Sequence, residues 1–315
     1  MKEIGGYIEL DTYSLPLLHK EAIALNCGRN ALAYVLKCKN IKKIYIPKFL
    51  CKSVYNVCQR EHVLVSFYNI DKSFLPIDLC LNDDEWLYIV NYYGQLTNDQ
   101  ILDYKKKYKN IIVDNAQSYF QMPVEGVDTL YTCRKYFGVA DGAFLYTDFK
   151  LNEVLPIDES YQRMQFILGR YERSANEFYT QYVENNRFFK DEPIKEMSKL
   201  TRNLLCGIDY NDVCNKRVNN FYYLHENLKE INQLEVSYMG TFMYPLFIDN
   251  ADVIRKELQK KKIYIPTLWP DAFEWCSENE IEHKFVQNIL PLPIDQRYST
   301  EDMKYIVEEI RKCLN

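Results

Sequence analysis

IIVDNAQ, at residues 111–117, is the most informative segment of this chain. Its β-branched residues predict a short, fully buried strand of a parallel sheet that ends at Asp114. Open α/β sheets bind ligands at the edge where their strands end. A carboxylate held there can pair with a protonated ring nitrogen of a ligand, or it can merely cap the next helix. The position of Asp114 alone leaves both interpretations open.

Short apolar runs of this kind alternate with helical stretches through the first half of the chain. The predicted strands lie at residues 43–47, 63–67, 86–90, 110–114 and 143–146. Strands that alternate with helices are typical of βαβ units around a mostly parallel sheet. The sequence therefore predicts an α/β fold.

The second half of the chain has a different pattern. We expect a helical stretch at residues 156–230 with a break at 207–209, a strand at 241–248, a helix at 251–260, a short strand at 262–265, and a last helix capped by Ser299. This order predicts a large domain at residues 1–207 and a small C-terminal α+β domain at residues 208–315.

The composition is typical of a soluble globular protein. Apolar residues make up 47% of the 315 positions, charged residues make up 26%, and the formal net charge is −5. A modest negative charge does not provide the basic surface that nucleic-acid binding requires. No apolar run approaches the roughly 18 residues of a membrane-spanning helix, and no signal peptide is recognisable. We expect a cytoplasmic protein whose partners are small molecules, with neither a nucleic-acid nor a membrane partner.

The cysteines and histidines do not suggest a metal site. Ten cysteines are spread along the chain without any C-x-x-C pair, and there are only four histidines. Structural zinc sites need closely spaced ligands of these types. We therefore expect reduced, mostly buried thiols and no metal.

Lys135 lies in TCRKYFG, residues 132–138, which DGA follows at residues 141–143. A lysine between apolar and aromatic segments can be partly desolvated, which lowers its pKa and frees the amine to attack an aldehyde. Most lysines instead lie on solvated surfaces. Only the neighbouring motifs favour the first interpretation.

Gly28 immediately precedes a predicted helix at residues 31–37, within NCGRNAL. The free amides and the dipole at a helix N-terminus can bind a phosphate group. One glycine before a helix is a weak signal, because most such sites are simple turns. The chain has neither a Walker loop nor a G-x-G-x-x-G motif.

These motifs, in this order, resemble the DegT/StrS-like family of pyridoxal 5′-phosphate (PLP) dependent nucleotide-sugar aminotransferases. Residues 27–32 are similar to its S-G-T-x-A-L turn, residues 90–95 to V-H-x-Y-G-Q with Asn91 in place of histidine, and residues 114–117 to D-x-A-Q/H. Lys135 precedes Gly142 by the interval that separates the family's PLP-binding lysine from its E-G-G turn. The resemblance implies fold type I, with a mostly parallel seven-stranded sheet between helices.

The resemblance also implies roles for individual residues. The amides of Arg29 and Asn30, after Gly28, would hold the cofactor phosphate, and Lys135 would bind PLP covalently. Asp114 would face the pyridine nitrogen, and Gln117 would lie near the 3′-oxygen of the ring. The remaining expectations concern a ring-covering aromatic residue, Phe49 or Tyr92, and two substrate contacts, Trp269 and Arg297.

Two departures from the family pattern affect the site. Leu130 stands where the family has a phosphate-binding serine, and Thr132 is a candidate substitute. The substitution Thr132→Val tests this role, because an unchanged PLP affinity would contradict it. Of the family's cross-subunit loop G-Y-N-x-R-M-S, only Met197 and Ser198 remain, with Ile194 and Glu196 in place of Asn and Arg.

By resemblance, we expect a homodimeric aminotransferase with sites at the subunit interface. It would move an amino group, from glutamate for example, to a nucleotide-linked keto sugar for a surface polysaccharide. A related sugar dehydratase carries histidine at the lysine position, and Lys135 argues against it. A non-catalytic family member that binds PLP, a sugar nucleotide or a partner protein without turnover stays open, because the cross-subunit loop is altered.

Overall fold

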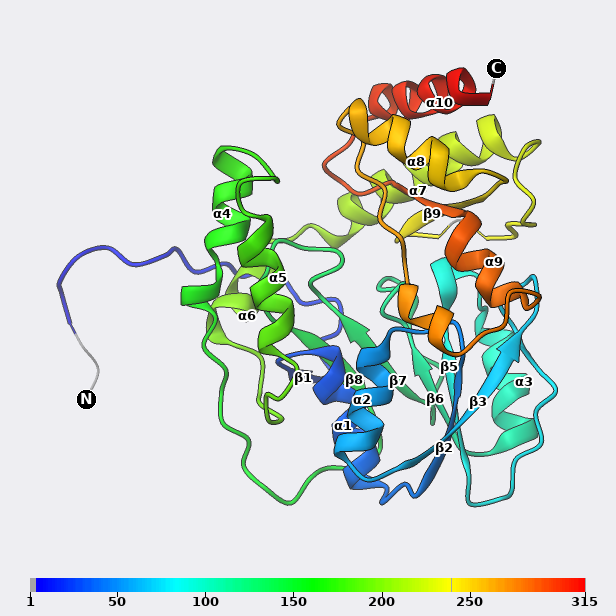
Figure 1. Ribbon diagram of the computed structural model, residues 1–315. Coiled ribbons are helices and arrows are strands. Elements are labelled where there is room, and N and C mark those ends of the chain that lie inside the picture. Colours follow the sequence, from blue (N-terminus) through cyan, green and yellow to red (C-terminus); the bar gives the residue numbers. More distant parts are fainter. Residues whose placement is uncertain (1–3, 239, 315) are drawn as a thin grey trace.

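The computed structural model describes residues 4–238 and 240–314, and its centre is a mixed sheet (Figure 1). Within those residues the sheet has eight strands in the order β1-β8-β7-β6-β5-β2-β3-β4. The strands are β1 (Ile23–Leu25), β2 (Lys43–Pro47), β3 (Leu64–Ile70), β4 (Pro76–Ile77), β5 (Trp86–Val90), β6 (Ile111–Asp114), β7 (Asp128–Thr132) and β8 (Ala143–Tyr146).

The middle of the sheet is parallel, as the alternating pattern predicts. β3, β2, β5, β6 and β7 pair in parallel, whereas β8, β1 and β4 are antiparallel to their neighbours. The α/β fold is therefore confirmed. The implied count of seven strands is wrong by one for the described residues, because the two-residue strand β4 adds to the edge beside β3.

Three helices connect the parallel strands and flank the sheet (Figure 1). They are α1 (Gly28–Cys38), α2 (Lys52–Arg60) and α3 (Asn98–Tyr108). α3 begins with a capping box, in which the Thr97 side chain accepts from the Gln100 amide and the Gln100 side chain accepts from the Thr97 amide. α1 is buried from Asn30 to Leu36, so it lies inside the domain rather than on its surface.

The predicted helical stretch consists of separate helices. They are α4 (Gln165–Glu172), α5 (Tyr179–Phe188), α6 (Lys199–Leu205) and α7 (Tyr210–Leu228), with a 3-10 turn, η2 (Tyr161–Arg163), before α4. α4 and α5 pack on each other beside the sheet (Figure 1). The predicted break at residues 207–209 is confirmed, since α7 begins after Asp209, whose side chain accepts from the Asp212 amide at 3.0 Å.

The C-terminal part is a small α+β lobe. It contains β9 (Met243–Phe247), α8 (Ala251–Lys260), the 3-10 turn η3 (Pro270–Glu274), α9 (Ile281–Asn288), β10 (Ile289–Pro293) and α10 (Thr300–Leu314). β9 and β10 form an antiparallel pair, and α7 and α8 pack against α10. The Ser299 hydroxyl accepts from the Asp302 amide at 3.4 Å at the start of α10, as predicted. The domain boundary at residue 207 stays a prediction.

The predicted short strand at residues 262–265 is wrong. Lys262 has φ of +62°, a left-handed conformation that ends α8, and the Ile263 amide bonds back to the Leu258 carbonyl oxygen at 2.9 Å. The apolar side chains of Ile263 and Ile265 are buried although the segment forms no strand. Their alternation therefore reflects anchoring in the core rather than sheet pairing.

Candidate functional site

Three segments bring polar groups to one edge of the sheet. β6 and β7 are parallel neighbours, with Asp114 opposite Leu130, so both strands end at this edge. β1 is antiparallel to β8, and β8 is antiparallel to β7, so β1 runs in the same direction as β7. α1 follows β1 directly. The topology thus places Asp114, Thr132 and the N-terminus of α1 at one edge, where open α/β sheets bind ligands.

Asp114 is buried at the end of β6, with 8% of its surface exposed. Its Oδ2 accepts a hydrogen bond of 2.7 Å from the Tyr88 hydroxyl, and its Oδ1 accepts one of 2.8 Å from the Ala116 amide. The second bond is the local turn that a purely structural aspartate would make. The first comes from a neighbouring strand and fixes the carboxylate from a second direction.

Lys135 lies in the loop after β7, and its ammonium nitrogen is 5.2 Å from the centre of the Phe242 ring. Desolvation by the surrounding protein lowers the pKa of Lys135, while the charge of Asp114 acts in the opposite direction. The charge of Asp114 thus reaches Lys135, the second predicted catalytic group. The Lys135 side chain itself is exposed in this structure.

The N-terminus of α1 offers free amides beside Thr132. Cys27 precedes the helix and makes no side-chain capping bond, and the amides of Arg29 and Asn30 lie in the first turn, where no intrahelical carbonyl accepts from them. A Cβ built on Gly28 would lie 3.9 Å from the Cβ of Thr132 and would meet nothing closer. Free amides and open space suit a phosphate group, so this corner fits the phosphate of PLP.

Gln117, three residues after Asp114, offers a free donor. Its Oε1 accepts from the Tyr93 amide at 2.7 Å, which fixes the orientation of the side-chain amide. Its Nε2 is buried and has no hydrogen-bond partner among the described residues. A buried donor without an acceptor is costly. The 3′-oxygen of PLP is an acceptor that Nε2 could satisfy.

The predicted aromatic contacts form one buried cluster. Phe49 and Tyr92 are each 1% exposed, and their rings stack with centroids 5.4 Å apart. Trp269 packs edge-on against both, at 4.6 Å from Phe49 and 5.3 Å from Tyr92. In this arrangement Phe49 and Tyr92 present almost no surface to a ligand. Their ring-covering role, and substrate binding by Trp269, stay predictions.

Arg297 is engaged with its own loop. Its guanidinium forms a two-pronged ion pair with Asp295, at 2.6 Å to Oδ1 and 2.8 Å to Oδ2. This pairing raises the pKa of Arg297 above its ordinary value. About half of the side chain is exposed, so a substrate would compete with Asp295 for it. Substrate binding by Arg297 also stays a prediction.

Arg217 is a residue that sequence reasoning missed. It is 1% exposed on α7, and its guanidinium donates to Gln296 Oε1 at 2.8 Å, the Thr241 carbonyl at 2.7 Å and the Tyr136 carbonyl at 3.2 Å. Tyr136 directly follows Lys135 in the loop between β7 and β8, residues 133–142, called the lysine loop below. Arg217 therefore connects the lysine loop to the small lobe. Its position four residues after Val213, on the buried face of α7, is the signal that could have identified it.

The segment at residues 194–198 packs into its own chain. Ile194 and Met197 are buried, and the Ser198 amide and hydroxyl both donate to Asp141, at 2.8 and 2.7 Å. The Thr201 hydroxyl also donates to Asp141. Ile194 and Met197 thus have almost no surface left for a second subunit, although the resemblance assigns this loop to cross-subunit contacts.

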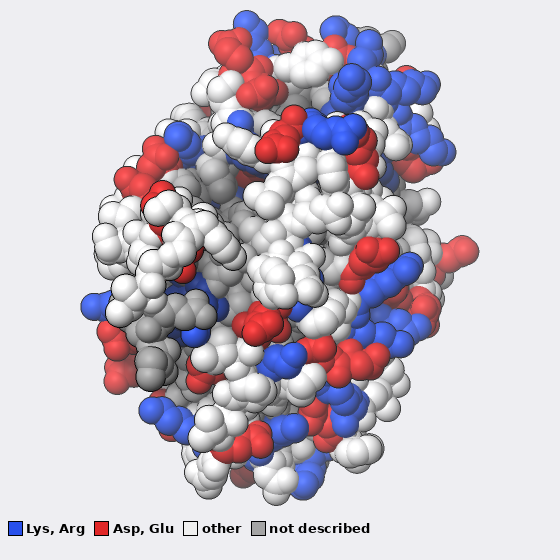
Figure 2. Space-filling view, turned by 90° about the vertical axis from the view of Figure 1, so that its left-hand side faces the viewer, with Lys and Arg blue, Asp and Glu red and all other residues white. Residues whose placement is uncertain are grey.

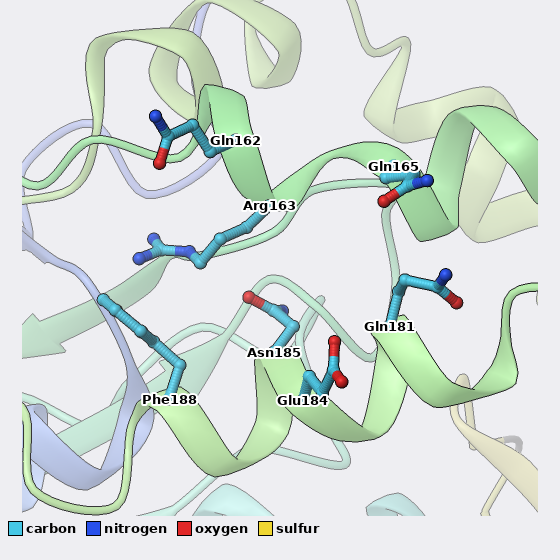
Figure 3. Close-up of a pocket in the computed structure, with 7 residues that line it drawn as sticks. All are labelled: Gln162, Arg163, Gln165, Gln181, Glu184, Asn185 and Phe188. Carbon is cyan, nitrogen blue, oxygen red and sulfur yellow. The ribbon is translucent and has the colours of Figure 1, made fainter.

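A cavity of about 200 Å³ lies between α5 and the segment that begins α4 (Figure 3). Six of its seven lining residues are polar or charged; the lining consists of Gln162, Arg163, Gln165, Gln181, Glu184, Asn185 and Phe188. The face in Figure 2 mixes positive and negative side chains around an uncharged central area.

The described residues contain no cluster of His, Cys, Asp or Glu that could hold a metal, and none of their helices is long and apolar enough to cross a membrane.

The structure is similar to solved structures that include aminotransferases. A DegT DnrJ EryC1 StrS aminotransferase from Brucella abortus superposes with a TM-score of 0.64 and 15% identity over 96% of this chain and 91% of that one. DesV from S. venezuelae superposes with a TM-score of 0.67 and 13% identity over 93% of this chain and 84% of that one. The protein ntda from Bacillus subtilis, with bound cofactor PMP, superposes with a TM-score of 0.64 and 12% identity over 96% of this chain and 78% of that one. No protein-family model matches the sequence, and no curated protein sequence is similar to it.

The chain therefore has the fold-type I architecture of the DegT/DnrJ/EryC1/StrS aminotransferases, as the sequence resemblance implies. At these identities the likeness establishes the fold. The chemistry depends on the site itself.

Proposed function

We propose that this protein is a PLP-dependent aminotransferase that transfers an amino group from an amino acid to a keto sugar. The observation that carries the proposal is the placement of Lys135 at one sheet edge with Asp114 and the uncapped N-terminus of α1. An amine, a carboxylate and a phosphate-binding corner are the three groups that hold PLP in a fold-type I site. Solved structures of similar fold include aminotransferases, and one of these structures contains PMP.

Four residues of this chain would hold the cofactor in place. The amides of Arg29 and Asn30, with the Thr132 hydroxyl, would hold the phosphate, and Gln117 Nε2 would donate to the 3′-oxygen. Bound PLP supplies an electron sink for the carbon that loses and gains a proton.

Two side chains would act on the protons of the reaction. The Asp114 carboxylate would keep the ring nitrogen protonated, because an adjacent negative charge favours the charged form. Lys135 would bind the cofactor and then, as a free amine, carry the proton between substrate and cofactor.

The substrate and assembly are the finer parts of the proposal. By resemblance the amino donor is glutamate, and the acceptor is a nucleotide-linked keto sugar destined for a surface polysaccharide. The cytoplasm is the proposed compartment. A homodimer with sites at the interface is also proposed, and the packing of Ile194 and Met197 into their own chain requires other residues to make the cross-subunit contacts.

A two-stage reaction tests the function. PLP-loaded protein is mixed with glutamate, and the visible absorbance of lysine-bound PLP is followed. Loss of that absorbance, and its return when a keto-sugar nucleotide from a panel is added, would establish transamination and name the acceptor. Lys135→Ala is the control. PLP binding without any change upon addition of amino acids would favour the non-catalytic alternative.

A further inference from the structure

Two arginines next to the candidate site converge on one uncharged residue. The Arg29 guanidinium donates to the Asn186 carbonyl oxygen at 2.9 Å, and the Arg134 guanidinium donates to Asn186 Oδ1 at 2.7 Å. Asn186 lies on α5, whereas Arg29 lies on α1 and Arg134 in the lysine loop. Asn186 thus holds two positive charges from different segments together.

No carboxylate among the described residues forms an ion pair with either arginine, whereas nearby Arg163 is paired with Asp158 at 2.7 Å. The charge of Asp141 reaches Arg134, but the oxygens of Asp141 accept hydrogen bonds from Ser198 and Thr201. Two like charges without a counter-ion repel each other. The arrangement therefore lacks one negative group.

Arg134 has an unsatisfied donor at this point. Its Nε is buried without an acceptor in the described part of the chain, and its guanidinium lies 4.7 Å from the centre of the Phe189 ring. Desolvation lowers the pKa of Arg134, and the charge of Arg29 lowers it further. A buried charge is normally paired and fully hydrogen-bonded. An anion between the two arginines would supply both the charge and an acceptor.

The pair adjoins the candidate cofactor site and the cavity in Figure 3. Arg29 follows Gly28 at the start of α1, and Arg134 precedes Lys135. Asn185, the residue before Asn186, lines the cavity, and its Oδ1 is buried without a hydrogen-bond partner among the described residues. An anionic group held by the arginines could therefore belong to a molecule that continues either toward Lys135 or toward this cavity.

We propose that the guanidinium groups of Arg29 and Arg134 bind a phosphate group, which is the missing negative charge. The planar guanidinium matches the oxygens of a phosphate well. The proposal deepens the proposed function and rests on it for the source of the phosphate. That source is the phosphate of PLP itself or the diphosphate of a nucleotide-linked substrate.

Binding measurements with matched ligands test the pair and identify the source. Arg29→Gln and Arg134→Gln each remove a charge and leave the backbone amides in place, and Arg170→Gln removes an exposed charge from α4 as the control. We expect each site variant to weaken the binding of one phosphate-bearing ligand about tenfold or more. If the phosphate belongs to the cofactor, the variants bind PLP more weakly but pyridoxal as tightly as before. If the phosphate belongs to the substrate, they bind UDP more weakly but uridine as tightly as before.

Two results would overturn the proposal. In the first, both site variants bind PLP and UDP as tightly as the Arg170→Gln control does. In the second, the variants lose as much affinity for the phosphate-free ligands as for their phosphorylated forms. If wild-type protein shows no lysine-bound PLP absorbance, the proposed function fails separately. Inorganic phosphate then still tests the site: it must raise the Tm above that in sodium chloride of equal ionic strength, and the double variant must lose this increase.

Discussion

The Tyr88 hydroxyl donates a hydrogen bond of 2.7 Å to Oδ2 of Asp114, and the phenol ring lies in the buried centre of β5. Burial raises the pKa of Tyr88 well above its ordinary value, and the charge of Asp114 raises it further. Tyr88 is therefore protonated at neutral pH and can only donate to this carboxylate. The sheet itself fixes the direction of the Asp114 side chain before any ligand binds.

Tyr88→Phe removes this donor from a buried charged acceptor. We expect it to lower the free energy of unfolding by about 1.5–3 kcal/mol, the usual range for a hydrogen bond to a charged group. Tyr68→Phe is the matched control, because the Tyr68 hydroxyl donates at 2.8 Å to the uncharged Tyr88 carbonyl; its expected loss is about 1 kcal/mol. Denaturant titration measures both. Equal losses in the two variants would contradict a charged acceptor.

Gly142→Ala tests the tight turn after the lysine loop. Gly142 has φ of +111°, and an added Cβ would lie 3.0 Å from Thr201 Cγ2 and 3.1 Å from Cys133 Sγ. We expect a loss of about 2–4 kcal/mol in the free energy of unfolding from backbone strain and overpacking together.

Gly126→Ala separates these two effects. Gly126 also has positive φ, at +70°, but an added Cβ would meet no atom within 4 Å. We expect a loss of about 1 kcal/mol from strain alone. A loss for Gly142→Ala no larger than for Gly126→Ala would show that the contacts with Thr201 and Cys133 are not restrictive.

His19 makes the stability depend on pH. It is fully buried, its Nε2 donates to the Tyr119 carbonyl at 2.8 Å, and burial lowers its pKa from 6.5 to about 4. Between these values the unfolded chain binds a proton that the folded chain does not, so stability falls as the pH falls through this window. We expect the full contribution of His19 to this loss to be about 3 kcal/mol.

His19→Gln isolates this contribution. The variant has no group that titrates at this position, so its free energy of unfolding should change less between pH 6.5 and pH 4 than that of the wild type. Denaturant titrations at both pH values give the comparison. The same pH dependence in the two proteins would assign the effect to other groups.

Much of the fold was predictable because its signals are local. The strand 86–90 and the helix 251–260 were predicted with the bounds that the structure gives, since each is a continuous apolar or amphipathic run between clear ends. β7 and β10 were not predicted, although each has five residues. β1 and β4 were not predicted either. They have three and two residues, too few for any periodicity, and only pairing with β8 and β3 makes them strands.

The site was predictable only in part. Asp114 and Lys135 carry motif signals, and both lie at the sheet edge. Tyr88 carries no such signal, and Arg217 has only its place on the buried face of a helix. Their roles arise from contacts with residues far away in the sequence, and such contacts exist only in the folded chain. The burial of Phe49 and Tyr92 could not be predicted from the sequence either, since an aromatic residue before a helix can face a ligand or the core.

Arg217→Ala tests the link between the small lobe and the lysine loop. It removes three hydrogen bonds from a buried charged group, so we expect a loss of about 3 kcal/mol or more in the free energy of unfolding, together with weaker PLP binding. Arg311→Ala is the control, because exposed Arg311 makes one bond, to the Asn227 carbonyl; we expect a change within about 0.5 kcal/mol. Unchanged PLP affinity in folded Arg217→Ala protein would separate Arg217 from the cofactor site.

The central claim is that Lys135 is the lysine that binds PLP. The most direct test is to reduce PLP-loaded protein with borohydride, which fixes the cofactor on its lysine, and to locate the added mass by peptide mass spectrometry. We predict one labelled site, Lys135, and no labelling of that peptide in Lys135→Ala. Stoichiometric label on another lysine, or no specific label in the wild type, would contradict the account.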